Sequence, residues 1–171
     1  NMGSKIMTPG LGFLYAQTGG MPRWIDPSEP GDRPRTSIAP IIVYKDDTPV
    51  MTLGAAGGLM IPPAIVQVLS RVIDRGDTLE DAIAAPRVSP VLKMITASYS
   101  DDEIMVEATP VNGWSDANIA KFESAGFEVS KKEKYSLFGR VHALEYDAGS
   151  DLWTGVADPD WEGSAAMLPA Q

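Results

Sequence analysis

Two glycines at the corner between an apolar strand and an amphipathic helix are the residues best suited to chemistry. Gly57 and Gly58 follow the apolar run 50–53 and precede Pro62 and Pro63, which suit the first turn of a helix because their missing N–H groups need no partner there. Glycines at such a corner let a ligand approach the backbone, whose N–H groups can bind an anion or the oxyanion of a reacting carbonyl. From these glycines alone, a tight corner that binds nothing is the more common arrangement.

A second candidate site lies in the segment Arg33-Pro-Arg-Thr-Ser37, where two cations are followed by two hydroxyls. Thr36 and Ser37 directly precede the apolar run 38–44. Hydroxyl and backbone groups at the start of a strand can bind a carboxylate, and the arginines would make the surroundings positive. Taken alone, these residues fit an ordinary loop leading into a strand even better.

The remaining candidates give weaker indications. His142 is the only histidine, and without a nearby nucleophile motif it is more typical of a structural residue than of a Ser-His-Asp triad or a metal cluster. The acidic pairs Asp46–Asp47 and Asp101–Asp102 have the composition of turns, and nothing places two carboxylates in one cleft. The absence of cysteine excludes disulfides and a thiol nucleophile.

The elements that position the glycine corner are predicted from periodicity and capping. The strand 38–44 is so continuously apolar that we expect burial on both of its faces, and it pairs with 50–53 as a hairpin. The other predicted elements are a helix from Pro62 to Arg75, a short helix capped by Thr78, strands 95–99 and 103–107 around a turn at Asp101–Asp102, a helix 115–125 capped by Ser115, a strand 127–130 and a hairpin 141–157.

This order of elements predicts an α+β fold with a largely antiparallel sheet in a single domain, residues 1–171, rather than a doubly wound fold. The glycine corner matches neither a Walker A loop nor a dinucleotide fingerprint. The net charge of −9 argues against nucleic acid and anionic membranes as partners, and no apolar run is long enough to span a membrane. The long polar segment 17–35 fits either a functional loop or a disordered surface excursion.

Taken together, an ordered set of motifs resembles the small subunit of γ-glutamyltranspeptidases. The set comprises Gly3-Ser-Lys-Ile-Met-Thr-Pro-Gly-Leu-Gly-Phe-Leu14, Asp32-Arg-Pro-Arg-Thr-Ser-Ile-Ala-Pro-Ile-Ile-Val43, Gly54-Ala-Ala-Gly-Gly58, Asp81-Ala-Ile-Ala-Ala-Pro-Arg87 and, more weakly, Glu123-Ser-Ala-Gly-Phe-Glu-Val129 and Gly155-Val-Ala-Asp-Pro159. No single motif is decisive, but together they cover nearly the whole chain in the right order.

The resemblance implies the αββα sandwich of N-terminal-nucleophile hydrolases, formed when a precursor cleaves itself. In that family the freed threonine of the small subunit attacks a γ-glutamyl amide such as glutathione, and its own α-amino group is the base. By correspondence, Gly57 and Gly58 would form the oxyanion hole, Thr36 and Ser37 would bind the donor α-carboxylate, and Arg87 would be structural. The resemblance further implies a large subunit of the same precursor as partner, a periplasmic or extracellular location, and no metal or cofactor.

Two departures from the family pattern qualify this interpretation. The nucleophilic threonine is expected upstream of Asn1, so the chain by itself should show no turnover. The family's acidic run, which binds the donor α-amino group, is replaced by Tyr15-Ala-Gln-Thr-Gly-Gly-Met21, and Asp26, Glu29 or Asp32 would have to substitute for it. An ammonium group without a carboxylate partner is poorly paired. The alternatives are therefore an acylase with a glutaryl-type or other donor, and a catalytically silent binding or scaffold homologue.

Overall fold

The computed structural model describes residues 5–15, 31, 36–93, 98–108, 113–133, 138–160 and 163–164. The chain divides into two compact units, Asn1–Ser37 and Ile38–Gln171, and each is described by itself. In the first unit, residues 5–15 form a loop closed by the Tyr15 N–H, which donates to the Ile6 carbonyl at 3.0 Å. Most of the predicted loop 17–35, including Arg33 and Arg35, lies outside the described residues.

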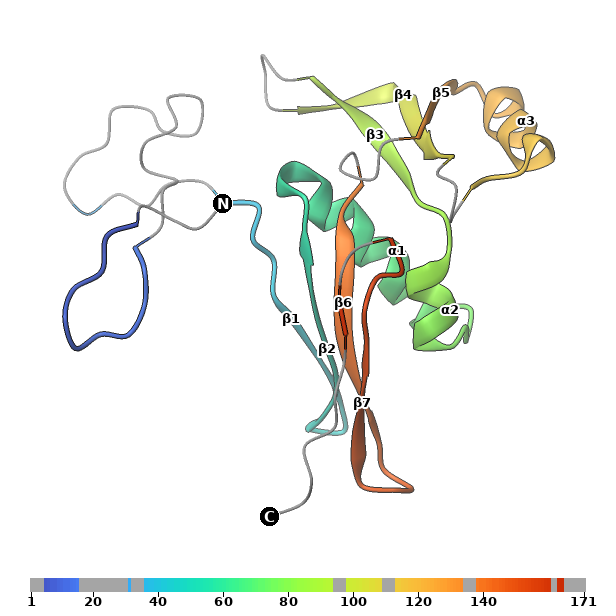
Figure 1. The fold of residues 1–171 in the computed structure, drawn as a ribbon. Helices are drawn as coiled ribbons and strands as arrows, with labels where there is room; N and C mark the ends of the chain where they lie inside the picture. Colours follow the sequence, from blue (N-terminus) through green and yellow to red (C-terminus); the bar gives the residue numbers. More distant parts are fainter. Residues whose placement is uncertain are drawn as a thin grey trace. The chain divides into compact units, whose positions relative to one another are not determined.

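The second unit contains a four-stranded and a three-stranded sheet (Figure 1). The four-stranded sheet is antiparallel throughout and has the order β1 (Ile41–Lys45), β2 (Thr48–Ala56), β6 (Arg140–Asp147), β7 (Leu152–Val156). The three-stranded sheet has the order β3 (Val88–Lys93), β4 (Ser98–Glu107), β5 (Glu128–Lys132), with β4 and β5 parallel. The helical elements are η2 (Gly58–Met60), α1 (Ile61–Ile73), α2 (Leu79–Ala84) and α3 (Asp116–Ser124).

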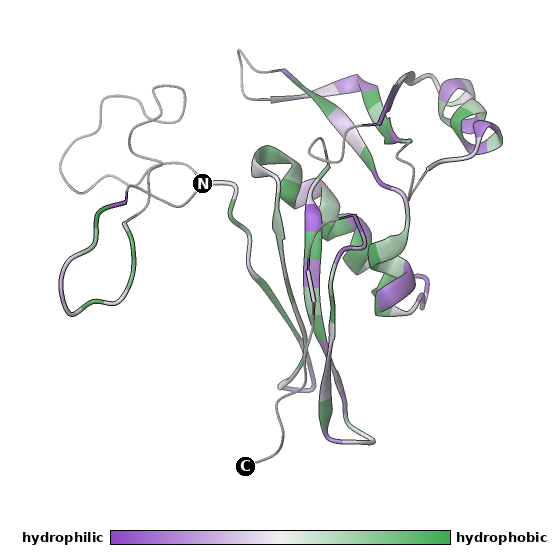
Figure 2. Cartoon of the chain, in the orientation of Figure 1, coloured by the Kyte–Doolittle hydropathy of each residue, from purple (hydrophilic) through white to green (hydrophobic). Residues whose placement is uncertain are grey.

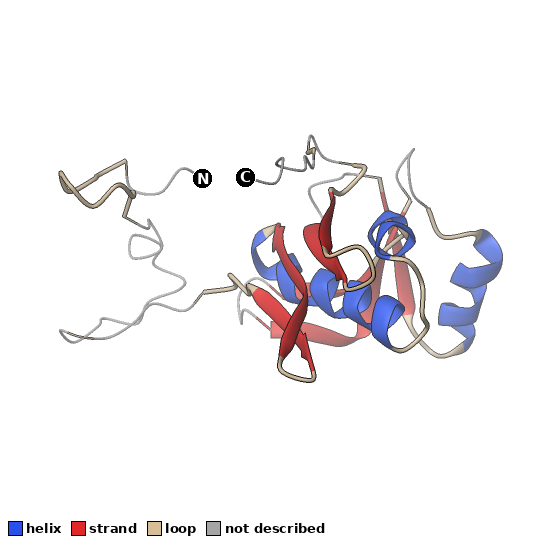
Figure 3. Ribbon diagram, turned by 90° about the horizontal axis from the view of Figure 1, so that it is seen from below, coloured by secondary structure: helices blue, strands red, loops and turns tan. Residues whose placement is uncertain are grey.

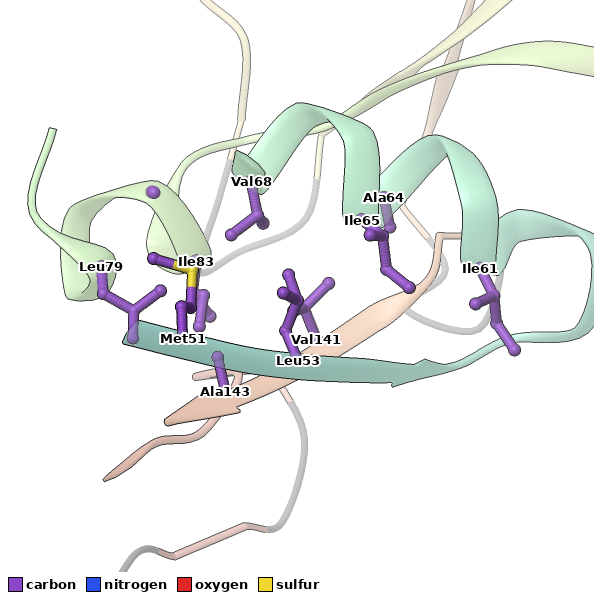
Figure 4. Packing of buried hydrophobic residues seen from close by; sticks show 11 residues of the cluster. Met51, Leu53, Ile61, Ala64, Ile65, Val68, Leu79, Ile83, Val141 and Ala143 are labelled. Atoms are coloured by element: carbon purple, nitrogen blue, oxygen red, sulfur yellow. The ribbon is translucent and has the colours of Figure 1, made fainter. Parts of the chain in front are cut away.

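Helix α1 packs against β2 and β6 of the larger sheet and also contacts β3 of the smaller one (Figures 1 and 3). Its sequence is largely apolar, whereas α3 has a strongly hydrophilic outer face (Figure 2). The main core lies between α1, α2 and the larger sheet (Figure 4) and consists of Met51, Leu53, Ile61, Ala64, Ile65, Val68, Leu79, Ala82, Ile83, Val141 and Ala143. Because side chains alternate along a strand, β2 turns Met51 and Leu53 toward the helices.

The opposite face of the larger sheet is exposed and apolar. Ile42 and Tyr44 of β1 are 56% and 60% exposed, and Leu144 and Trp153 are also exposed. The prediction that the strand 38–44 is buried on both faces is therefore wrong for this chain. Only the face that carries Ile41 and Val43 packs against the core.

The predicted order of elements is confirmed, and so are two caps. Thr78 accepts a hydrogen bond from the Asp81 N–H at 3.1 Å, and Ser115 accepts one from the Asn118 N–H. The predicted strand 103–107 is confirmed as the second half of β4, and most of the predicted strand 95–99 lies outside the described residues, but the turn predicted at Asp101–Asp102 is wrong. The structure has β3 at Val88–Lys93 followed by β4 at Ser98–Glu107, so Asp101–Asp102 lies within a strand and not in a turn. Both aspartates fall in the register shift between the pairs Leu92–Tyr99 and Pro90–Ile104, where the pairing of β4 with β3 is interrupted.

Candidate functional site

The candidate site is the turn formed by Gly57 and Gly58 between β2 and α1. Gly57 has φ +138° and Gly58 has φ +60°, conformations that residues with a side chain rarely adopt. Both glycines are exposed, and a Cβ at Gly58 would meet no atom within 4 Å. The sequence therefore places glycine where the backbone needs it, and Gly58 presents its backbone to open space at the start of η2 and α1.

The turn is packed tightly against the segment that enters β6. A Cβ on Gly57 would lie 2.9 Å from the Gly139 Cα. A Cβ on Gly139 would in turn lie 2.6 Å from the Met60 carbonyl oxygen and 2.8 Å from the Ala64 Cβ. These glycines allow two backbone segments to touch, so the position of the turn depends on the start of β6.

Hydrogen bonds fix the turn from within and from the smaller sheet. The Met60 N–H donates to the Gly57 carbonyl at 3.1 Å, and the Ile61 N–H donates to the Gly58 carbonyl. The hydroxyl of Tyr99 in β4 donates to the Leu59 carbonyl. Sequence reasoning missed Tyr99, because it is 40 positions away from Leu59.

A buried network of charged side chains surrounds the start of β6, next to Gly139. Arg140 pairs with Glu107 at 2.9 Å and with Asp160 at 3.3 Å, and all three side chains are at most 1% exposed. Arg87 pairs with Asp158 at 2.8 Å and also donates to the Ile83 carbonyl.

Two backbone contacts join these ion pairs into one network. The Arg87 N–H donates to Glu107 at 2.9 Å, and the Val141 N–H donates to Asp158 at 3.1 Å. The end of β4, the start of β6 and the segment after β7 are thus held together by charge. Arg87, which the family resemblance assigns a structural role, is buried here in ion pairing and not in an exposed cleft.

Glu107 is under opposing influences in this network. Burial raises the pKa of Glu107, and it outweighs the Arg87 N–H and the Arg140 guanidinium, which lower it. Its environment thus stabilises the carboxylate less than water does, even though it is hydrogen-bonded. The arrangement is typical of a buried ion pair, in which desolvation offsets much of the Coulombic gain.

Thr36 and Ser37, the predicted carboxylate-binding residues, lie at the end of the first unit. Thr36 is exposed and Ser37 is half-buried. Gly57 and Gly58, in contrast, belong to the second unit. The proposed substitutes for the acidic anchor, at positions 26, 29 and 32, lie outside the described residues.

Two of the weaker candidates, the pair Asp46–Asp47 and His142, lie in or between strands of the larger sheet. Asp46 and Asp47 both have positive φ and form the two-residue turn between β1 and β2, as the sequence predicted for this pair. His142 is exposed and lies opposite Gly54 in the sheet register.

Within the described ranges, no group of three or more His, Cys, Asp or Glu side chains is arranged to hold a metal ion. No helix in the described part of the chain is long and apolar enough to cross a membrane.

Comparison with known proteins gives a consistent set of relatives. A family model described as gamma-glutamyltranspeptidase matches residues 1–168. The chain is 27% identical over 167 residues to the glutathione hydrolase proenzyme of Bacillus subtilis (strain 168), covering 95% of this chain and 26% of that protein. It is 33% identical over 91 residues to the acylase ACY 1 proenzyme of Pseudomonas sp. (strain V22), covering 50% of this chain and 16% of that protein. The chain thus spans about a quarter or less of the length of these relatives.

A solved structure shares the fold. The W525D mutant of the gamma-glutamyltranspeptidase from Pseudomonas nitroreducens is 24% identical, with a TM-score of 0.70 over 99% of this chain and 89% of that chain. This likeness confirms the predicted α+β fold of the N-terminal-nucleophile hydrolase type.

Proposed function

Because this chain belongs to the gamma-glutamyltranspeptidase family, we propose that it forms the oxyanion-binding part of an enzyme that transfers or hydrolyses γ-glutamyl groups of amides such as glutathione. The observation that carries this proposal is the exposed turn at Gly57 and Gly58. Its positive φ angles and its place at the start of η2 and α1 suit backbone N–H groups that bind a developing negative charge.

The chemistry of the complete protein follows from this assignment. A threonine upstream of this chain attacks the amide carbonyl, its hydroxyl proton passes to its own α-amino group, and the carbonyl oxygen becomes an oxyanion at Gly57 and Gly58. Collapse of this intermediate breaks the C–N bond, and the leaving amine takes the proton. Water or an amine then attacks the acyl-enzyme, which releases the acid or the transpeptidation product and restores the threonine.

Thr36 and Ser37 bind the α-carboxylate of the donor in this proposal. Two adjacent hydroxyls can each donate to a carboxylate oxygen, and hydrogen bonds to a charged group are among the stronger ones in proteins. Both residues lie immediately before Ile38, where the second unit begins.

The partner of this chain is the large subunit of the same precursor. The relative from Bacillus subtilis is a proenzyme about four times as long as the matched part. The exposed face of the larger sheet, formed by Ile42, Tyr44, Leu144 and Trp153, is a surface of the kind that another layer covers. The continuous apolar sequence of β1 is typical of a strand buried on both faces, which the partner would achieve.

An acylase with a different donor is the second candidate. The segment Tyr15–Met21 contains no Asp or Glu to pair with an α-ammonium group, and the relative from Pseudomonas sp. (strain V22) is named an acylase. A glutaryl amide has the same carbon chain and a carboxylate in the place of the α-carboxylate, but it has no ammonium group, so it would avoid this unpaired charge.

The two candidates are separated by comparing γ-glutamyl and glutaryl 4-nitroanilides as substrates of the protein expressed from its complete coding sequence. Release of 4-nitroaniline from the γ-glutamyl compound with the higher kcat/KM supports the first candidate. Preference for the glutaryl compound supports the acylase. Folded protein that releases no product from either compound contradicts both and leaves the binding or scaffold homologue.

A further inference from the structure

Leu59 follows the glycine turn and lies in the middle of η2 (Gly58–Met60). Its carbonyl has no hydrogen-bond donor within η2 and α1. In a helix this carbonyl would accept from the N–H three or four positions further on, and those positions are Pro62 and Pro63. Proline has no N–H, so neither can supply the bond. Leu59 is half-buried, so its carbonyl is left to accept from water or from a donor in another part of the fold.

Tyr99 provides this donor from the neighbouring sheet. Its hydroxyl, carried by β4, donates to the Leu59 carbonyl. Burial raises the pKa of Tyr99, so the hydroxyl keeps its proton and remains a donor across the physiological range. This hydrogen bond acts on the backbone of the turn, because its acceptor is the carbonyl of Leu59, between Gly58 and Met60.

Two peptide groups connect the Tyr99 hydroxyl to the Gly58 N–H. The peptide whose carbonyl Tyr99 binds also carries the Met60 N–H, which donates to the Gly57 carbonyl at 3.1 Å. The peptide that contains the Gly57 carbonyl carries the Gly58 N–H on its other side. Hydrogen bonds in such a chain polarise one another, by about 10–30% per bond. Each bond also fixes the rotation of the next peptide plane.

We propose that Tyr99 is a positioning residue for acyl transfer, aligning and polarising the Gly58 N–H through the Leu59–Met60 and Gly57–Gly58 peptides. This role rests on the proposed function, in which the Gly58 N–H binds the oxyanion. Tyr99 does not touch the substrate and acts only through the turn. A more strongly polarised N–H stabilises an oxyanion more than a neutral carbonyl, so the effect belongs to the transition state.

The test is Tyr99→Phe in the protein expressed from its complete coding sequence, with γ-glutamyl and glutaryl 4-nitroanilides as substrates. We expect kcat to fall about tenfold with KM nearly unchanged, a smaller loss than the ~100-fold that follows removal of an oxyanion-hole donor. Tyr146→Phe is the matched control, because its hydroxyl bonds to Asp151 in the β6–β7 hairpin, and it should keep the wild-type kcat.

A rescue variant separates positioning from general stability. Pro63→Ala introduces an N–H four positions after Leu59, which can donate to the same carbonyl. The double variant Tyr99→Phe/Pro63→Ala should therefore recover most of the lost kcat. A general loss of stability would appear as a lower melting temperature without this recovery.

Each outcome decides the matter. A wild-type kcat for Tyr99→Phe overturns the positioning role, and so does a loss of kcat that Pro63→Ala does not restore. In both cases turnover by the wild-type protein leaves the proposed function intact. Wild-type protein that folds without any turnover overturns the proposed function and the role of Tyr99 with it.

Discussion

Replacing Arg140 by methionine tests how the start of β6, and with it the glycine turn, is held in place. Methionine fills a similar volume but removes the ion pairs that Arg140 forms with Glu107 and Asp160, whose side chains have no exposed surface. Breaking a buried pair by removing one partner costs about 3–5 kcal/mol, because the other charge stays buried. We expect a loss of this size, or roughly 10 °C in melting temperature for a domain of this length.

The loss of stability caused by Arg140→Met should be smaller at low pH than at high pH. Burial already raises the pKa of Glu107, and removal of Arg140 takes away an influence that lowers it. A carboxyl whose folded pKa is raised above its unfolded value favours the folded state at low pH, and that stability is lost as the pH rises through the folded pKa. The variant should therefore be less destabilised at about pH 5 than at about pH 8, since Glu107 can take up a proton.

Thermal melts of the complete protein at the two pH values measure this effect. Lys131→Met is the control, because it removes an ion pair at 2.6 Å to Asp116 that is exposed to solvent, and it should leave the melting temperature unchanged. Arg140→Met/Glu107→Gln should recover part of the loss, because no unpaired charge then remains at position 107. A loss below about 1 kcal/mol at both pH values would refute the reasoning, since it would mean that the network is hydrated or yields easily.

Two further substitutions test local geometry. Gly57→Ala should destabilise the protein by at least about 2 kcal/mol, because its Cβ would lie 2.9 Å from the Gly139 Cα at a φ of +138°. Gly54→Ala is the control and should be neutral, since a Cβ there has nothing within 4 Å. Equal melting temperatures for the two variants would contradict this reasoning. Thr78→Ala should lower the free energy of unfolding by about 1 kcal/mol, because it removes the acceptor of the hydrogen bond from the Asp81 N–H, and Thr78→Ser should retain most of that stability. Urea denaturation measures both variants, and an unchanged midpoint for Thr78→Ala would show that the cap is unimportant.

Local signals predicted the elements that local chemistry controls. The cap at Thr78, the two-residue turn at Asp46–Asp47 and the helix that begins near Pro62 follow from short-range hydrogen bonds and backbone preferences, so single residues identify them. The sequence did not predict β3, whose conformation depends on its pairing with β4, and it placed a turn inside β4 because two adjacent aspartates are typical of turns.

The pairing around Arg140 could not be predicted, because its members come from four separate segments; the family resemblance marks Arg87 as structural but identifies none of its partners. The role of Tyr99 is a different case. Pro62 and Pro63 indicate that the Leu59 carbonyl needs a donor from elsewhere, but only the fold identifies which residue provides it.

The exposed apolar face of the larger sheet shows how a correct local pattern can conflict with the structure of one chain. The sequence of β1 predicts burial on both faces, whereas Ile42 and Tyr44 are exposed. The conflict disappears if a partner layer covers this face, as the proposed function requires.

The most direct test of the central claim is the effect of Gly58→Ala on acyl transfer by the complete protein. The alanine Cβ would meet no atom within 4 Å, so the fold should survive, while the strain of a φ of +60° and the added methyl group act directly on the residue whose N–H is proposed to bind the oxyanion. The account predicts a fall in kcat/KM of roughly 100-fold, against an unchanged value for Gly54→Ala. A folded Gly58→Ala protein with wild-type kcat/KM would contradict the assignment of this turn as the oxyanion site.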